Sequence, residues 1–114
     1  MSDTRVAVQF LEHHLGDRPV DVEAHVLGAH YAAEIERFQL AFQWGRRAVF
    51  LAPDAPYVVF LLADICARSG RDDLVGRYER WTDELLAERH PDEPLQYSDG
   101  CRVHQLREVL RGNR

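Results

Sequence analysis

Residues 48–71 read AVFLAPDAPYVVFLLADICARSGR, and this stretch decides the fold. One apolar run ends at Pro53, a second begins after Pro56, and Gly70 ends the second run. The eleven residues 57–67 contain a single charged side chain. We expect them to form a helix that is apolar on nearly every side, and such a helix has to be covered on two sides. What covers its second side is the functional question for this chain.

Length and composition point to one ordinary globular domain. A chain of 114 residues can bury its own core, so we expect a single helical domain over residues 1–114. The net charge of −5 argues against nucleic acid or an anionic membrane as the main partner. No apolar run approaches the roughly 18–20 residues of a membrane-spanning helix, and no signal-peptide pattern opens the chain. We therefore expect a cytoplasmic protein.

The spacing of apolar residues predicts six helices and no strand, which is an all-α fold. The expected helices cover residues 5–15, 22–34, 38–51, 56–69, 73–89 and 101–110. The residues expected to cap the second, fourth, fifth and sixth helices are Asp21, Asp54, Asp72, and Ser98 or Asp99. Because the connections are short, neighbouring helices should be antiparallel.

The prolines recur with a regular spacing. Pro19 and Pro53 are 34 positions apart, and Pro56 and Pro91 are 35 apart. Each interval is expected to contain a helix, a short turn and a second helix. A period of about 34 residues built in this way is the spacing of tetratricopeptide repeats (TPRs).

The sequence resembles TPR proteins within two units, residues 21–55 and 56–90. The matching residues of the first unit are Leu27, Gly28, Tyr31, Ala41, Ala48, Val49 and Pro53. Those of the second unit are Leu62, Ala63, Gly70 and Tyr78. The small residues let helix backbones approach closely. The resemblance implies a TPR-like antiparallel helix-turn-helix solenoid of about six helices.

The flanking segments complete this expected array. Residues 3–15 form an N-terminal helix that looks like half a unit. Residues 98–111 form a C-terminal capping helix, which hides the last apolar face of a repeat array. The alternative is a plain helical bundle in which the proline spacing is a coincidence.

The resemblance also implies a concave groove lined by the first helix of each unit. The groove residues expected from it are Val22, His25, Ala29 and Ala33 in the first unit, and Tyr57, Phe60, Asp64 and Arg68 in the second. The residues expected to pack between helices are Leu27, Gly28, Tyr31, Val59, Leu62, Ala63 and Cys66. Such an apolar and aromatic groove suits a partner helix or an extended peptide. The alternative is that the first or last helix of the chain itself fills the groove.

The polar residues indicate no metal site, cofactor or catalytic set. The six histidines have no spacing that suits a shared metal ion, and no nucleophile or phosphate-binding motif is present. We expect Cys66 and Cys101 to be free thiols. Asp64 and Arg68 have the spacing of an ion pair along a helix. We therefore expect a protein that is not an enzyme.

Three functions remain open from the sequence. The first is an adaptor or small chaperone that binds another protein, similar in size and repeat type to the chaperones of bacterial type III secretion. The second is a self-associating scaffold protein that forms a homodimer through the same apolar surface. The third is a small helical enzyme or ligand carrier that uses His25 and Asp64 in a closed pocket.

Overall fold

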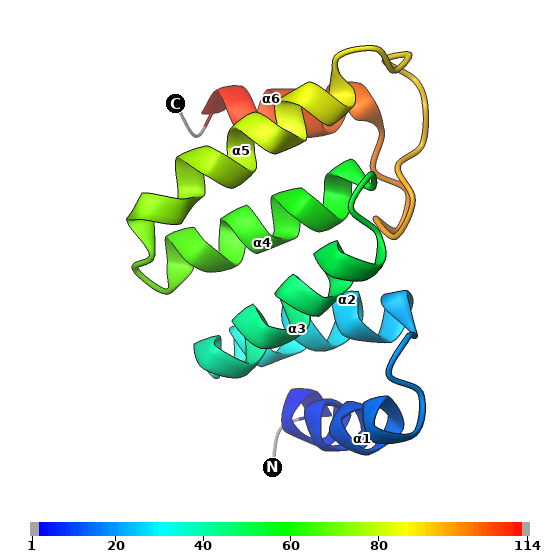
Figure 1. The fold of residues 1–114 in the computed structure, drawn as a ribbon, viewed down its shortest axis with the longest axis vertical. Helices are drawn as coiled ribbons and strands as arrows, with labels where there is room; N and C mark the ends of the chain where they lie inside the picture. Colours follow the sequence, from blue (N-terminus) through cyan, green and yellow to red (C-terminus); the bar gives the residue numbers. More distant parts are fainter. Residues whose placement is uncertain (1–2, 113–114) are drawn as a thin grey trace.

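The computed structural model describes residues 3–112, and over these residues it contains six α-helices and no β-strand (Figure 1). The helices are α1 (Asp3–Asp17), α2 (Val22–Glu34), α3 (Phe38–Leu51), α4 (Pro56–Arg68), α5 (Asp72–Leu86) and α6 (Val103–Gly112). The all-α prediction is confirmed, and α2 and α3 have the expected bounds. Helix α5 ends three residues earlier than expected, and α6 begins two residues later.

Three of the expected helix ends are confirmed. The side chain of Asp21 accepts a hydrogen bond from the backbone N–H of Ala24 at 3.0 Å, which caps α2. Pro56 occupies the first turn of α4, where its missing N–H costs nothing. Gly70 follows α4 with a φ of 79°, a conformation that glycine adopts without strain.

The other cap predictions were wrong. Ala55 and Arg71 precede α4 and α5, and neither makes a side-chain cap, so Asp54 and Asp72 do not have the expected role. At the start of α6 the backbone N–H of Arg102 donates to the side-chain oxygen Oε1 of Gln105 at 2.8 Å. In a capping box, the side chain of the third helical residue accepts a hydrogen bond from the backbone N–H of the cap residue, and Gln105 does this here. This bond takes the place of the expected caps from Ser98 or Asp99.

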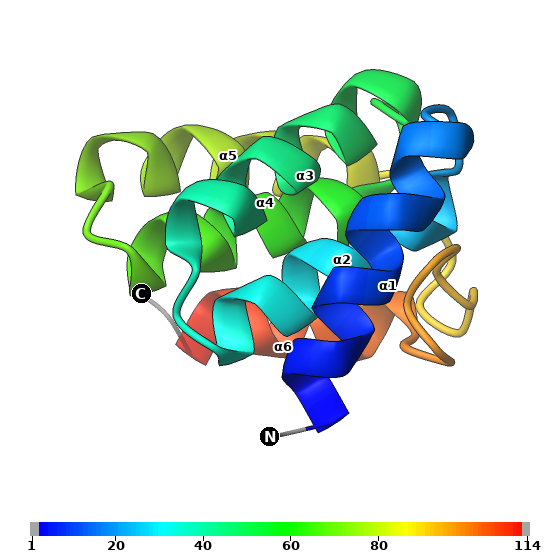
Figure 2. The ribbon, with the colours of Figure 1, turned by 90° about the horizontal axis from the view of Figure 1, so that it is seen from below.

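The helices form two antiparallel hairpins with one helix at each end. Figure 1 shows the hairpin α2–α3 stacked on the hairpin α4–α5, with α1 outside the first and α6 outside the second. Figure 2 shows α3 and α5 on one side of the molecule and α2 and α6 on the other. Helix α4 lies inside the stack, where it contacts α2, α3 and α5.

The apolar helix α4 is covered on both sides by the chain itself, although not along its whole length. Its residues Val58, Val59, Leu62 and Ile65 are fully buried in the core cluster that runs from α1 to α4. On the other side, Tyr57 and Phe60 pack against a second cluster. Its buried members are Leu86, Leu95, Val103, Leu106 and Leu110. The C-terminal segment therefore covers part of the surface that we expected to be open.

A close approach of α2 and α3 depends on Gly28. A Cβ atom at this position would lie 2.6 Å from Cε3 of the Trp44 indole, which is closer than real contacts allow. The indole therefore packs directly against the backbone of α2 at Gly28. Gly28 is thus the small packing residue that the sequence predicted, and Trp44 is its partner.

Polar contacts hold α1 against α2. The Nε2 atom of His14 donates to the carboxylate of Asp21 at 2.8 Å, and Arg37 pairs with Glu12 at 3.1 Å. The buried ring of His25 donates from Nδ1 to the backbone oxygen of Asp21 at 2.9 Å. Asp21 therefore joins the start of α2 both to α1 and to the core histidine.

We expect the stability of the fold to fall in mild acid because of His25. Burial lowers the pKa of this imidazole below its ordinary value of 6.5. As the pH falls below about 6.5, the unfolded chain takes up a proton at this site and the folded chain does not, so the free energy of unfolding decreases until the pH passes the folded pKa. Thermal melts between pH 7.5 and 5 should therefore show a falling Tm.

The matched comparison uses two histidine variants. The fall in Tm should be shallower for His25→Gln, which cannot titrate, and unchanged for His104→Gln, because His104 is exposed. Equal slopes for the wild type and His25→Gln would contradict the role of His25.

Candidate functional site

A groove of about 830 Å³ lies between α2, α4 and the loop that precedes α6. Its lining residues are Glu23, Val26, Leu27, His30, Tyr31 and Glu34 from α2, Tyr57 and Leu61 from α4, and Tyr97, Ser98 and Asp99 from the loop. The α2 residues recur every three or four positions, so they form one stripe along that helix.

The centre of the groove is apolar and aromatic. Val26 and Leu61 form a buried floor, and the rings of Tyr31 and Tyr57 are half-buried at its sides. Leu27 leaves 45% of its surface exposed, although it lies at the middle of α2. An exposed leucine beside half-buried tyrosines is a surface that gains free energy when a partner covers it.

The polar groups of the groove are mostly acidic. Glu23, Glu34 and Asp99 are exposed, and none of the lining residues is Arg or Lys. His30 lies 3.8 Å from Glu34. Burial raises the pKa of the Tyr57 phenol, and the nearby charges of Cys101, Asp64 and Asp99 raise it further. The lining of the groove therefore contains three carboxylates and no Arg or Lys.

One end of the groove is formed by a tightly bonded loop. Tyr97 has a φ of 68° and Asp99 a φ of 54°, and the left-handed region is unfavourable for a bulky tyrosine. The Ser98 hydroxyl compensates by donating to the backbone oxygen of Leu95 at 2.6 Å and by accepting from the N–H of Cys101 at 3.0 Å. These bonds hold Tyr97 at the mouth of the groove in a conformation that it would rarely adopt alone.

The expected site residues of α4 lie in three different environments. Tyr57 lines the groove, and its expected role in binding a partner stays a prediction. Phe60 packs against the α6 cluster. Asp64 and Arg68 form the expected ion pair, at 3.9 Å, and Arg68 also donates to the backbone oxygen of Ala33 at 3.3 Å. These two residues lie beyond the groove, at the end opposite Tyr97.

The expected exposure of the α2 residues was wrong. His25 and Ala29 are only 3% and 0% exposed, and Val22 is half-buried against the core. The physical reason is that α1 and α3 cover this face of α2. His25 lies beside Leu15 of α1 and Trp44 of α3. Their binding role stays a prediction, but they offer almost no surface to a partner.

None of the six α2 residues that line the groove was expected there from the sequence, and four of these six are Glu23, Leu27, His30 and Glu34. Leu27 was expected to pack between helices. A signal was present, since these four positions follow the heptad-like spacing of one helix face and three of them are polar. The small residues Gly28, Ala29, Ala32 and Ala33 mark the opposite, buried face. Tyr97 and Asp99 gave no such signal, because a long loop carries them to the groove.

The opposite face of the molecule is also aromatic, and its rings have partners within the chain, as the groove rings of Tyr31 and Tyr57 have in His30 and Phe60. On α5 the rings of Tyr78 and Trp81 stack with centroids 6.3 Å apart. The guanidinium of Arg71 lies 3.8 Å from the centre of the Phe42 ring on α3. These contacts stabilise the α3–α5 face. The hollow beside Tyr78 and Trp81 has a volume of about 420 Å³, about half that of the α2–α4 groove, so the groove is the larger candidate site.

The described residues provide little for chemistry. Within residues 3–112, no three His, Cys, Asp or Glu side chains lie close enough together to hold a metal ion. Both cysteines are free thiols, and burial raises the pKa of Cys66 and of Cys101, which disfavours the reactive thiolate. Among the helices of this part of the chain, none has the length and apolar character to cross a membrane.

Comparison with known proteins adds no family to this description. No protein-family model matches the chain, and no curated protein is detectably similar in sequence. Fold and site together define the chain as an all-helical protein of stacked hairpins with an acidic, tyrosine-lined groove.

Proposed function

We propose that this protein is a non-enzymatic adaptor or small chaperone that holds a helix or extended segment of another protein in the α2–α4 groove. The observation that carries this proposal is the exposed Leu27 between the half-buried rings of Tyr31 and Tyr57. The exposed apolar surface of Leu27 does not stabilise the isolated chain. A partner that covers Leu27 and Tyr57 buries this surface at the centre of an interface, and that burial stabilises the complex.

A TPR-like array is part of the same proposal. It is supported by two hairpins in register with the proline period, by the close contact of Gly28 with Trp44, and by the open turn at Gly70. TPR-like grooves are lined by the first helix of each hairpin, which here means α2 and α4. A cytoplasmic location is also proposed, and the two free thiols support it.

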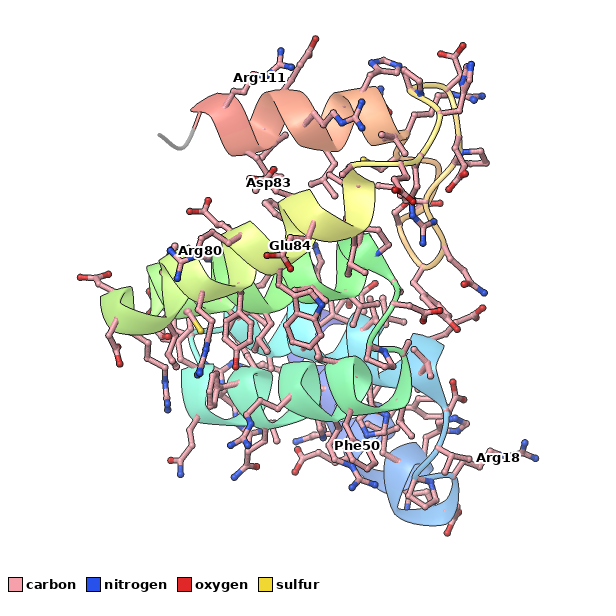
Figure 3. The ribbon with its side chains drawn as sticks, turned by 45° about the horizontal axis from the view of Figure 1, so that its top comes forward. Arg18, Phe50, Arg80, Asp83, Glu84 and Arg111 are labelled. Atoms are coloured by element: carbon pink, nitrogen blue, oxygen red, sulfur yellow. The ribbon has the colours of Figure 1, made fainter. Side chains whose placement is uncertain are left out.

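The test compares proteins captured from the native cell by tagged variants. Leu27→Ser removes the exposed apolar anchor of the groove, and we expect it to lose the bound partner. Phe50→Ser makes a similar change on α3, on the other side of the molecule, and should keep the partner (Figure 3). If both variants keep the same partners at equal yield, the groove is not the binding site.

The competing proposal is a scaffold protein that closes a homodimer through this groove. The same exposed Leu27 favours it, because a second copy would cover the side chain equally well. A solution mass of 13.2 kDa over a wide concentration range would exclude the homodimer. A mass twice as large that returns to 13.2 kDa in Leu27→Ser would favour it over the adaptor.

A further inference from the structure

The charge of the groove is one-sided. Its carboxylates are Glu23 and Glu34 on α2 and Asp99 on the loop, and no Arg or Lys lines it. Arg68 lies beyond the far end, where it pairs with Asp64 and with the backbone of α2. A segment that enters the groove therefore meets acidic groups at its rim and is favoured if it is positively charged.

The positions of these carboxylates set a spacing. Glu23 and Glu34 are eleven residues apart on one face of α2, which corresponds to about 16 Å along the helix axis at 1.5 Å per residue. Asp99 lines the same groove from the loop that forms one end of it. A helix that lies along α2 would need basic side chains about eleven residues apart to meet both ends.

The middle of the groove fits apolar anchors and a guanidinium group. Leu27, Val26 and Leu61 provide the apolar surface between the two acidic ends. The lining contains three tyrosines, and an arginine stacks on an aromatic ring better than most side chains do. The chain already makes this kind of contact elsewhere, where Arg71 lies on Phe42.

We propose, as a refinement that rests on the proposed adaptor function, that the occupant of the groove is a basic amphipathic helix of another protein. Its apolar stripe contacts Leu27 and Leu61, and its arginine or lysine side chains contact Glu23 with Asp99 at one end and Glu34 at the other. The partner is thus identified by its chemistry, namely an apolar helical face flanked by positive charge.

The probe is a pair of fluorescein-labelled helical peptides of about 18 residues, long enough to span the groove. Both carry the same leucine stripe. One has arginines at flanking positions eleven residues apart, and its twin has glutamates there. Fluorescence anisotropy with the full chain at low salt should show the basic peptide binding about tenfold or more tightly, because several exposed ion pairs add up. The preference should shrink as salt screens the charges.

A matched pair of triple variants separates local charge from overall charge. Glu23→Gln with Glu34→Gln and Asp99→Asn removes the groove carboxylates, and asparagine tolerates the positive φ of position 99. Glu84→Gln with Glu88→Gln and Asp92→Asn makes the same change in net charge at exposed sites outside the groove lining (Figure 3 labels Glu84 on α5). We expect only the first set to abolish the preference for the basic peptide.

Each outcome decides one question. Equal binding of the two peptides would contradict the proposal that the partner is basic. A preference for the basic peptide that survives in the groove triple variant would contradict it as well. If Leu27→Ser still weakens both peptides in that case, the adaptor function stands. If neither peptide binds, the basic partner and the proposed function are overturned together.

Discussion

The variant Leu62→Ala is expected to lose about 2–5 kcal/mol of the free energy of unfolding. Leu62 is 1% exposed and lies where α4 packs on α3. A Cβ atom at Gly45 would be only 3.1 Å from Cδ1 of Leu62, so the two helices are close at this point. Because the backbone of α3 at Gly45 lies against the Leu62 side chain, truncating that side chain leaves a space between the two helices, and the well-packed core can close it only in part. Urea denaturation followed by circular dichroism measures the loss.

The matched control is Leu27→Ala, the same chemical change in the groove. Leu27 is 45% exposed, so its removal should change the free energy of unfolding by no more than about 0.5 kcal/mol. It should nevertheless weaken peptide binding. A loss as large as that of Leu62→Ala would mean that Leu27 is a core residue and that the groove is closed in solution.

The second large effect is expected from Gly28→Ala, which should lower the free energy of unfolding by about 1–3 kcal/mol. The new methyl group would lie 2.6 Å from the Trp44 ring, so either the indole or the whole of α3 has to move. The intrinsic preference of alanine for helices, up to about 1 kcal/mol, opposes this loss but should not cancel it. The same substitution at Gly16 in α1 meets no atom within 4 Å and should stabilise the protein slightly.

A double-mutant cycle shows whether the Trp44 indole causes the loss of stability expected for Gly28→Ala. In a Trp44→Leu background the ring is absent, so Gly28→Ala should cost less than in the wild type. The difference is expected to be about 1 kcal/mol or more, because the two side chains are in direct contact. Additive effects of the two changes would show that Gly28 is needed for a reason other than the Trp44 ring.

Much of the secondary structure was predictable because its signals are local. Asp21, Pro56 and Gly70 mark helix ends through their own backbone chemistry, and they do so in the structure. The end of α2 had no such signal, since Glu36 takes a φ of 61° where a glycine would be usual. The N–H groups of Glu36 and Arg37 bond to backbone oxygens of α2 at 3.0 and 2.8 Å, which stabilises this turn.

The candidate site was predictable only in part. Tyr57 was identified because the strongly apolar α4 had to present some surface. Helix α2 was harder, because its hydrophobic pattern is weak: Leu27 interrupts the polar stripe of Glu23, His30 and Glu34. Without a clear pattern, the rotation of a helix about its axis depends on its neighbours.

The sequence by itself determined six helices, their order in antiparallel hairpins, and the two-sided burial of α4, since periodicity, proline and glycine act within a few residues. Only the tertiary structure decided which face of α2 lines the groove, and it did so through the Trp44 ring on Gly28 and the packing of α1. It also brought Tyr97 and Asp99 to the groove, more than thirty positions from Tyr57 in the chain. Contacts over that separation depend on how the hairpins and the last helix pack together, and no local pattern contains that information.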